Sequence, residues 1–267
     1  MATLPETKTL ALDLDHGWLT VWFNQPERRN PLTDEAVEDL AAVIEAIAPQ
    51  RDIRGMTIRG KGGFFCAGGD LKGFKAMATG ETEASMRMSR RIGDVLADLN
   101  ALPQVTVAVI EGAAMAGGLG VACCCDVTIG MKDAKFGFSE TRIGITPAQI
   151  ARYVLQKCGY STGRRLMLTA ARFAGEEAGK LGVLDFVADT TEDLSSLEQR
   201  VKQDVLECAP GAVAACKALI IGMPGTPDEE KVEFAAQNFS GCLQGDEGKE
   251  GVASFLEKRK PNWHTEI

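Results

Sequence analysis

The sequence has little histidine and no paired cysteine motif. Its 267 residues include only two histidines, His16 and His264, and each lies near one end of the chain. This scarcity argues against a Ser-His-Asp triad, a Cys-His pair or a zinc site with histidine ligands, because each needs histidine beside other functional groups. The eight cysteines contain no Cys-x-x-Cys pair, and three of them are consecutive at 123–125. We therefore expect buried free thiols in a reducing cytoplasm, with no metal site and no disulfide framework.

Long apolar runs and an excess of positive charge are also absent. No run of 18 apolar residues occurs, and the segment MATLPETKTLALDLD lacks the apolar stretch of a signal peptide, so neither a membrane span nor secretion is expected. The formal net charge is −8. A nucleic-acid partner is not expected, because phosphate binding needs clustered cations. A local basic group for a small anionic ligand remains compatible with this charge.

The chain is 45% hydrophobic and long enough for a sizeable core. Residues 9–15 and 18–23 alternate apolar and polar side chains around a His-Gly turn, which predicts a β-hairpin. Residues 105–110 form a continuous apolar run, typical of a strand buried on both faces. The chain after about residue 148 is predicted to be helical throughout. We expect a β-rich core over residues 1–195 and a helical region over residues 196–267.

Two glycine-rich turns, residues 62–69 and 115–120, each follow an apolar strand and precede a helix. Such turns point backbone N–H groups at a shared space, although the glycines could instead only permit close packing of helix on strand. Neither turn matches a dinucleotide or P-loop motif. Together they could form an oxyanion hole for a thioester carbonyl, with Glu140 as the group that moves a proton. The alternative for Glu140 is a surface glutamate paired with Arg142.

The motifs 65–71, 109–118, 125–126 and 134–140 resemble, in order and spacing, the signature of the crotonase (enoyl-CoA hydratase/isomerase) family. Residues 26–33 and 247–261 fit the same family, so the resemblance covers nearly the whole chain. It implies an α/β fold, the crotonase-type spiral of ββα repeats, with a helical C-terminal trimerisation region. It also implies a homotrimer or a dimer of trimers.

The resemblance further implies an acyl-CoA substrate, with coenzyme A as part of the substrate and no separate cofactor or metal. Glu140 would be the catalytic acid/base, and the backbone N–H groups of Ala67 and Gly117 would form the oxyanion hole. The loop with Arg28 and Arg29 would meet the phosphates and adenine of coenzyme A. The full set of implied substrate-binding residues is Arg28, Arg29, Cys66, Gly68, Gly69, Asp70, Leu71, Gly118 and Gly120.

The chain departs from the family at Gly120, where typical hydratases carry the first of two catalytic glutamates. One carboxylate could hydrate a double bond by handling both protons in turn, or could act as the single base of a Δ3-Δ2-enoyl-CoA isomerase. A third possibility is a member that binds acyl-CoA without turnover. Residues 144–150 also depart from the family's usual turn, which predicts an unusual acyl pocket.

Residues 116–120, 139–144 and 147–150 resemble a subgroup that hydrates branched glutaconyl-type thioesters. This subgroup includes the hydratases of 3-methylglutaconyl-CoA and isohexenylglutaconyl-CoA, in leucine and acyclic terpene degradation. The resemblance therefore favours hydration over isomerisation. The second carboxylate of such a substrate would need a partner, for which Arg142 and Arg152 are candidates.

Overall fold

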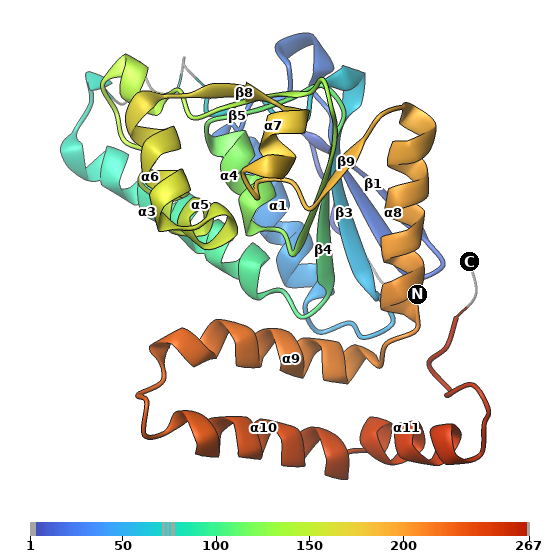
Figure 1. Cartoon of the computed structure of the whole chain (residues 1–267). Coiled ribbons are helices and arrows are strands. Elements are labelled where there is room, and N and C mark those ends of the chain that lie inside the picture. The colour runs from blue at the N-terminus through green and yellow to red at the C-terminus, as the bar shows by residue number, and fades with distance from the viewer. Residues whose placement is uncertain (1–3, 71–72, 74, 76–77, 266–267) are drawn as a thin grey trace.

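The computed structural model describes residues 4–70, 73, 75 and 78–265, and it contains two sheets in that part of the chain (Figure 1). The larger sheet has the strand order β1-β2-β3-β4-β6-β9. Strands β1 and β2 form the predicted antiparallel hairpin, and the other neighbours are parallel. The strand bounds are β1 (Leu10–Asp15), β2 (Trp18–Phe23), β3 (Gly55–Gly60), β4 (Val105–Ile110), β6 (Val127–Met131) and β9 (Phe186–Ala188).

The smaller sheet has the order β5-β7-β8, formed by β5 (Ala113–Met115), β7 (Lys135–Gly137) and β8 (Arg172–Ala174). The chain passes from β4 to β5 and from β6 to β7, so consecutive strands enter different sheets before the next helix. This is the expected α/β spiral of repeated units. Strands β8 and β9 lie in the region predicted to be helical throughout, so that prediction was wrong there. Each has three residues, too few for an alternating pattern to be visible in sequence.

Helices enclose the larger sheet and extend beyond it. Helix α1 begins as predicted, because the Thr33 side chain accepts a hydrogen bond from the Ala36 N–H. No single helix among the described residues is long and apolar enough to cross a membrane. The helix bounds are α1 (Asp34–Ile47), α3 (Thr82–Ala101), α4 (Gly117–Cys124), α5 (Ala151–Cys158), α6 (Tyr160–Thr169), α7 (Gly175–Lys180), α8 (Thr191–Leu206), α9 (Pro210–Gly222), α10 (Lys231–Gln244) and α11 (Asp246–Leu256).

Strand β4 is buried on both faces, as its apolar run predicted. Ala108 and Ile110 belong to the main core with α1, α3 and α4, whereas Val107 and Val109 face the second cluster. Leu194 of α8 belongs to that second cluster. Helix α8 is therefore part of the core, and the expected boundary between residues 195 and 196 falls inside it. The helices that project from the core begin with α9 (Figure 1).

We call α9, α10 and α11 (residues 210–256) the C-terminal arm. Lys217 of α9, only 8% exposed, joins the arm to the core. Its Nζ donates to the Gln104 carbonyl at 2.6 Å and lies 2.5 Å from Asp126 Oδ2. The same Asp126 oxygen accepts hydrogen bonds from the backbone and side chain of Thr106. This shared carboxylate compensates the buried ammonium, which would otherwise be costly to desolvate.

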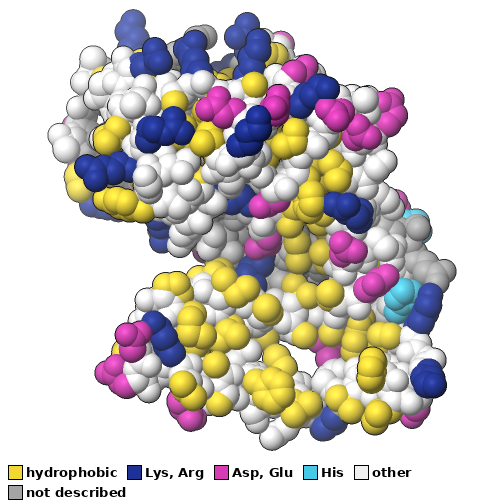
Figure 2. Space-filling model, in the orientation of Figure 1, with side chains coloured by type: hydrophobic (Ala, Val, Ile, Leu, Met, Phe, Trp, Pro, Cys, Tyr) yellow, Lys and Arg dark blue, Asp and Glu magenta, His cyan; other side chains and the backbone are white. Residues whose placement is uncertain are grey.

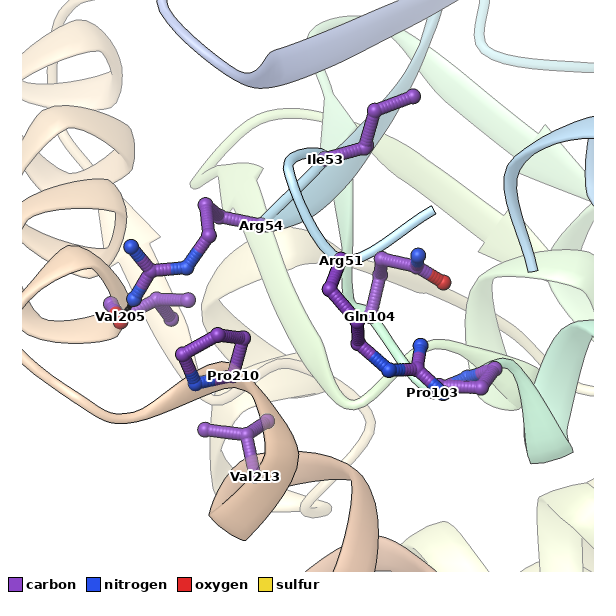
Figure 3. A pocket seen from close by; sticks show the side chains of 8 residues that line it. All are labelled: Arg51, Ile53, Arg54, Pro103, Gln104, Val205, Pro210 and Val213. Atoms are coloured by element: carbon purple, nitrogen blue, oxygen red, sulfur yellow. Dashed lines mark hydrogen bonds between the residues drawn. The ribbon is translucent and has the colours of Figure 1, made fainter. Parts of the chain in front are cut away.

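Arg54 binds the two chain segments that flank the arm, beside a cavity of about 10 Å³ that Pro210 and Val213 of α9 also line (Figure 3). Its guanidinium donates to the Leu206 carbonyl at 3.3 Å and to the Cys208 carbonyl, at the end of α8. It also donates to the Trp263 carbonyl at 2.9 Å. The last carbonyls of a helix have no N–H donor within the helix, so Arg54 supplies the hydrogen-bond donor that the carbonyls at the end of α8 lack.

Replacing Arg54 by methionine is expected to lower the free energy of unfolding by about 1–3 kcal/mol, because several carbonyls lose a charged donor. Urea unfolding followed by circular dichroism measures the change. Arg51→Met is the matched control, since Arg51 lines the same cavity but is exposed and makes one hydrogen bond, to the Ala48 carbonyl. Equal unfolding midpoints for the two variants would contradict the role assigned to Arg54.

Candidate functional site

A cavity of about 730 Å³ lies where the two glycine-rich turns meet α3 and the segment 145–150. Five of the residues implied by the family resemblance line it: Arg28, Gly69, Asp70, Gly117 and Glu140. Its volume is in the usual range for a small-molecule site. Leu71, also implied as a substrate contact, lies outside the described residues.

Helix α4 begins at this cavity with Gly117, whose N–H has no acceptor within the helix. The preceding residue, Ala116, has φ 49° and ψ −124°, an unusual conformation for a residue with a Cβ, and it turns the chain into the helix. The nitrogen of Gly69 lies 3.8 Å from the place that a Cβ on Gly117 would occupy. Two backbone amides from different turns therefore meet at one wall, where the positive end of α4 adds to their field.

The structure does not support Ala67 as the first oxyanion donor. The Ala67 N–H donates to the Arg29 carbonyl at 3.0 Å, and Ala67 is not among the residues that line the cavity. The Gly69 N–H, two residues later, has no hydrogen-bond acceptor within the described part of the chain. The donor pair that the geometry offers is therefore Gly69 and Gly117.

Cys66, Gly68 and Gly118 lie behind the cavity wall and hold the two turns together. The Cys66 side chain is fully buried, and this burial raises the pKa of its thiol to about 12. Its Sγ accepts a hydrogen bond from the Gly68 N–H, and a Cβ on Gly118 would lie 2.5 Å from the Cys66 Cβ. The carbonyl of Gly68 accepts from the Leu32 N–H at 2.8 Å. These residues do not line the cavity.

The two adjacent arginines take different positions. Arg28 lines the cavity, and its guanidinium lies 3.4 Å from the Asp70 carboxylate. Both side chains are partly exposed, so this ion pair contributes little to stability and leaves Arg28 able to meet an anionic ligand. Arg29 does not line the cavity, and its guanidinium stacks 5.3 Å from the centre of the Phe64 ring.

Glu140 begins a short 3₁₀ turn, η3 (Glu140–Ile143), just after β7. It is 8% exposed, and its Oε2 is buried with no hydrogen-bond partner among the residues that the structure describes. Desolvation by burial raises the pKa of Glu140 above its ordinary value. The Arg142 guanidinium donates to the Ala170 carbonyl at 3.1 Å, so the alternative of a surface glutamate paired with Arg142 is wrong. A buried carboxyl with a raised pKa in a cavity is suited to acid/base catalysis.

The position of Gly120 is filled from outside its helix. A Cβ on Gly120 would lie 2.0 Å from Ile150 Cγ2, so no side chain fits while Ile150 remains there. Gly120 is buried and does not line the cavity, whereas Ile150 does. The expected substrate contact at Gly120 is therefore replaced by Ile150, which sequence reasoning missed. The only signal was the departure from the family pattern at 144–150.

One face of α3 also lines the cavity, through Ser85, Met88, Ser89 and Ile92 at helical spacing. These residues carry no motif and were not predicted. Arg142 and Arg152, the candidate partners for a second substrate carboxylate, do not line the cavity. The Arg152 guanidinium donates to the Tyr153 hydroxyl and stacks on that ring. Among the described residues, no group of three or more His, Cys, Asp or Glu is placed to hold a metal ion.

Comparison with known proteins identifies the family. Residues 14–266 match the model of the enoyl-CoA hydratase/isomerase family. The chain is 32% identical over 246 residues to the enoyl-CoA hydratase AFT6-1 of Alternaria alternata, covering 91% of this chain and 80% of that protein. The structure of AtuE from Pseudomonas aeruginosa is similar at 39% identity and a TM-score of 0.94, covering 97% of this chain and 100% of that one. An enoyl-CoA hydratase/isomerase from Marinobacter aquaeolei is similar at 35% identity and a TM-score of 0.92, covering 96% and 99%. Because the family model spans nearly the whole chain and the α/β spiral matches solved members, the chain belongs to the enoyl-CoA hydratase/isomerase family.

Proposed function

We propose that this enzyme hydrates an α,β-unsaturated acyl-CoA thioester. The single observation that carries the proposal is the Glu140 carboxyl in the same cavity as the Gly69 and Gly117 amides, with its Oε2 buried and without a hydrogen-bond partner among the described residues. The two N–H groups would bind the thioester oxygen, and Arg28 would meet the phosphates of coenzyme A at the cavity edge. Coenzyme A enters as part of the substrate.

Each step uses one of these groups. The oxygen of water adds to Cβ, and negative charge develops on the thioester oxygen as the double bond gives up its electrons. The two amides and the positive end of α4 would stabilise that charge. Glu140 takes one proton from the water and delivers a proton to Cα, so the carboxylate is regenerated and the product carries one added water.

We further propose a branched glutaconyl-type substrate, such as 3-methylglutaconyl-CoA or isohexenylglutaconyl-CoA, in leucine or acyclic terpene catabolism. The resemblance at 116–120, 139–144 and 147–150 supports this assignment, as does the unusual wall formed by Ile150.

A cytoplasmic location is consistent with the eight cysteines, all free, because disulfides are rare in reducing compartments.

One observation favours isomerisation of a Δ3- to a Δ2-enoyl thioester as the second candidate. Ile150 fills the place of a second carboxylate, and a single base suffices to move a proton from Cα to Cγ. Purified protein supplied with straight and branched Δ2- and Δ3-enoyl-CoA thioesters separates the two reactions. A mass gain of one water from a Δ2 substrate supports hydration, whereas double-bond migration without water gain supports isomerisation and contradicts the proposal.

We propose that the C-terminal arm forms a homotrimer or a dimer of trimers. Large apolar side chains gather on its surface (Figure 2), around a cavity of about 750 Å³ bounded by α9, α10 and α11. Phe255 is 84% exposed and Phe239 is 67% exposed, which is unusual for aromatic side chains in a monomer. Light scattering should give three or six times the chain mass of 28.5 kDa. A monomer at micromolar concentration would contradict this assembly.

A further inference from the structure

Two consecutive side chains of the segment 145–150 insert against glycines of two different helices. Ile150 occupies the space above Gly120 of α4. Gln149 occupies the space above Gly93 of α3, where a Cβ would lie 2.4 Å from Gln149 Oε1. Glycine is less favourable than alanine inside a helix, so a glycine in the middle of α3 needs a reason. The close approach of the Gln149 carboxamide supplies one.

Ser89, one helical turn before Gly93, fixes the other side of the same carboxamide. Gln149 Nε2 donates to Ser89 Oγ at 2.9 Å. Both residues line the main cavity together with Glu140. The orientation of Gln149 is thus held from two positions of one helix face, as expected for a group that must present its polar atoms in a defined direction.

The Ser89–Gln149 pair retains two unused donors. A serine hydroxyl that accepts a hydrogen bond still has its own proton, and an amide nitrogen that donates one hydrogen bond has a second N–H. Neither donor has a further partner within the part of the chain that the structure describes. Ser85, on the same face of α3, differs because its hydroxyl already donates to the Thr82 carbonyl at 2.8 Å.

The acidic groups of the lining stand on other elements: Asp34 and Glu35 in the first turn of α1, Asp70 in the first glycine turn, and Glu140 at the start of η3. The wall formed by α3 and the segment 145–150 therefore presents donors without a carboxylate of its own. Hydrogen bonds to an ionised acceptor contribute more than those to a neutral one. Donors held in place without a protein acceptor match a ligand that carries an ionised acceptor.

We infer that Ser89 and Gln149 form a subsite that binds a carboxylate on the acyl group, and that they select dicarboxylic enoyl thioesters over simple ones. This inference rests on the proposed hydration of an acyl-CoA thioester. It replaces Arg142 and Arg152 as partners for the second carboxylate with two neutral donors. Gly93 belongs to the same subsite, because the absence of a side chain there leaves space for the Gln149 carboxamide.

The kinetic test compares kcat/KM for glutaconyl-CoA, which has a distal carboxylate, with kcat/KM for crotonyl-CoA, which has none. Ser89→Ala and Gln149→Leu are each expected to lower the value for glutaconyl-CoA by about 10- to 100-fold and to leave the value for crotonyl-CoA within about threefold. Ser195→Ala is the control and should change neither value, because Ser195 is exposed on α8 outside the cavity lining and its hydroxyl, like that of Ser85, donates to a helix carbonyl. Ser89→Thr keeps the hydroxyl and should retain the preference. Equal losses on both substrates, or no loss on glutaconyl-CoA, would overturn the inference.

A binding measurement separates this inference from the proposed function. Glutaryl-CoA and butyryl-CoA are saturated and cannot be hydrated, so calorimetry reports their affinity without turnover. Wild-type protein should bind glutaryl-CoA at least about tenfold more tightly, and Ser89→Ala should remove that difference. If the preference exists but no thioester is hydrated, the proposed function fails and the subsite stands. If glutaconyl-CoA is hydrated without any such preference, the subsite fails and the function stands.

Discussion

Replacing Glu140 by glutamine is expected to lower kcat for enoyl-CoA hydration by about 10²- to 10⁴-fold, the usual contribution of acid/base catalysis. The amide has nearly the same shape as the carboxyl but cannot take a proton from water or return one to Cα. Steady-state assays of purified variants with the best substrate measure the loss. Because the substitution leaves the proposed oxyanion donors Gly69 and Gly117 unchanged, the affinity for a saturated acyl-CoA should change by less than about threefold.

Glu35→Gln is the matched control for this substitution. Glu35 also lines the cavity, but it lies in the exposed first turn of α1 and plays no part in the proposed proton transfer. Its kcat should stay within about threefold of the wild-type value. A Glu140→Gln variant with full activity would remove Glu140 from the mechanism and leave the cavity without the acid/base that both candidate reactions need.

The same substitution is expected to stabilise the protein at neutral pH. Burial raises the pKa of Glu140 above its ordinary value of 4.5, so the folded state favours the protonated carboxyl and its ionisation costs free energy of folding. That cost is absent below pH 4.5 and grows as the pH rises through the raised pKa. Glutamine never ionises. Melting temperatures of both proteins between pH 4 and 8 should therefore diverge with rising pH, with the variant higher, and parallel curves would contradict the assigned cause.

Introducing glutamate at position 120 is expected to destabilise the protein by more than about 3 kcal/mol. The new Cβ would lie 2.0 Å from Ile150 Cγ2, and the carboxylate would enter a buried helix face without a prepared partner. The expected result is therefore low soluble yield or a sharply reduced unfolding midpoint. A restored two-glutamate site is not expected from this single change.

Removing the obstructing side chain tests the steric explanation. The double variant Gly120→Glu/Ile150→Gly should recover at least half of the stability lost by Gly120→Glu, because residues in contact are energetically coupled. Ile150→Gly alone completes the double-mutant cycle. Leu194→Ala, in the second core cluster, provides a control whose effect should add independently. Strictly additive losses at positions 120 and 150 would contradict the direct clash.

The sequence predicted the elements that depend on local pattern. The β1–β2 hairpin, the Thr33 cap and the double-sided burial of β4 each follow from a period or a capping residue within a few positions. The family motifs at 65–71 and 109–118 also identified both glycine turns. These motifs did not identify which amide of the first turn is free, because that depends on the Arg29 carbonyl, which lies far back in the chain and accepts from Ala67.

The walls of the acyl pocket were harder to predict for the same reason. A glycine inside a helix shows that something approaches closely, but the identity of the approaching side chain is a property of the folded chain. Gln149 and Ile150 belong to a segment with no regular pattern, and their partners Gly93 and Gly120 lie on two separate helices. Only the departure from the family's usual turn marked this segment in advance.

The neighbouring positions of Gln149 and Ile150 have a consequence for how this enzyme can change during evolution. One residue borders the proposed specificity subsite, and the next closes the place where a second catalytic glutamate would stand. Any insertion or backbone shift in the segment moves both side chains together. On the proposed roles of these two residues, substrate range and reaction type are therefore coupled, and a lineage that regained a second glutamate would have to rebuild its acyl preference as well.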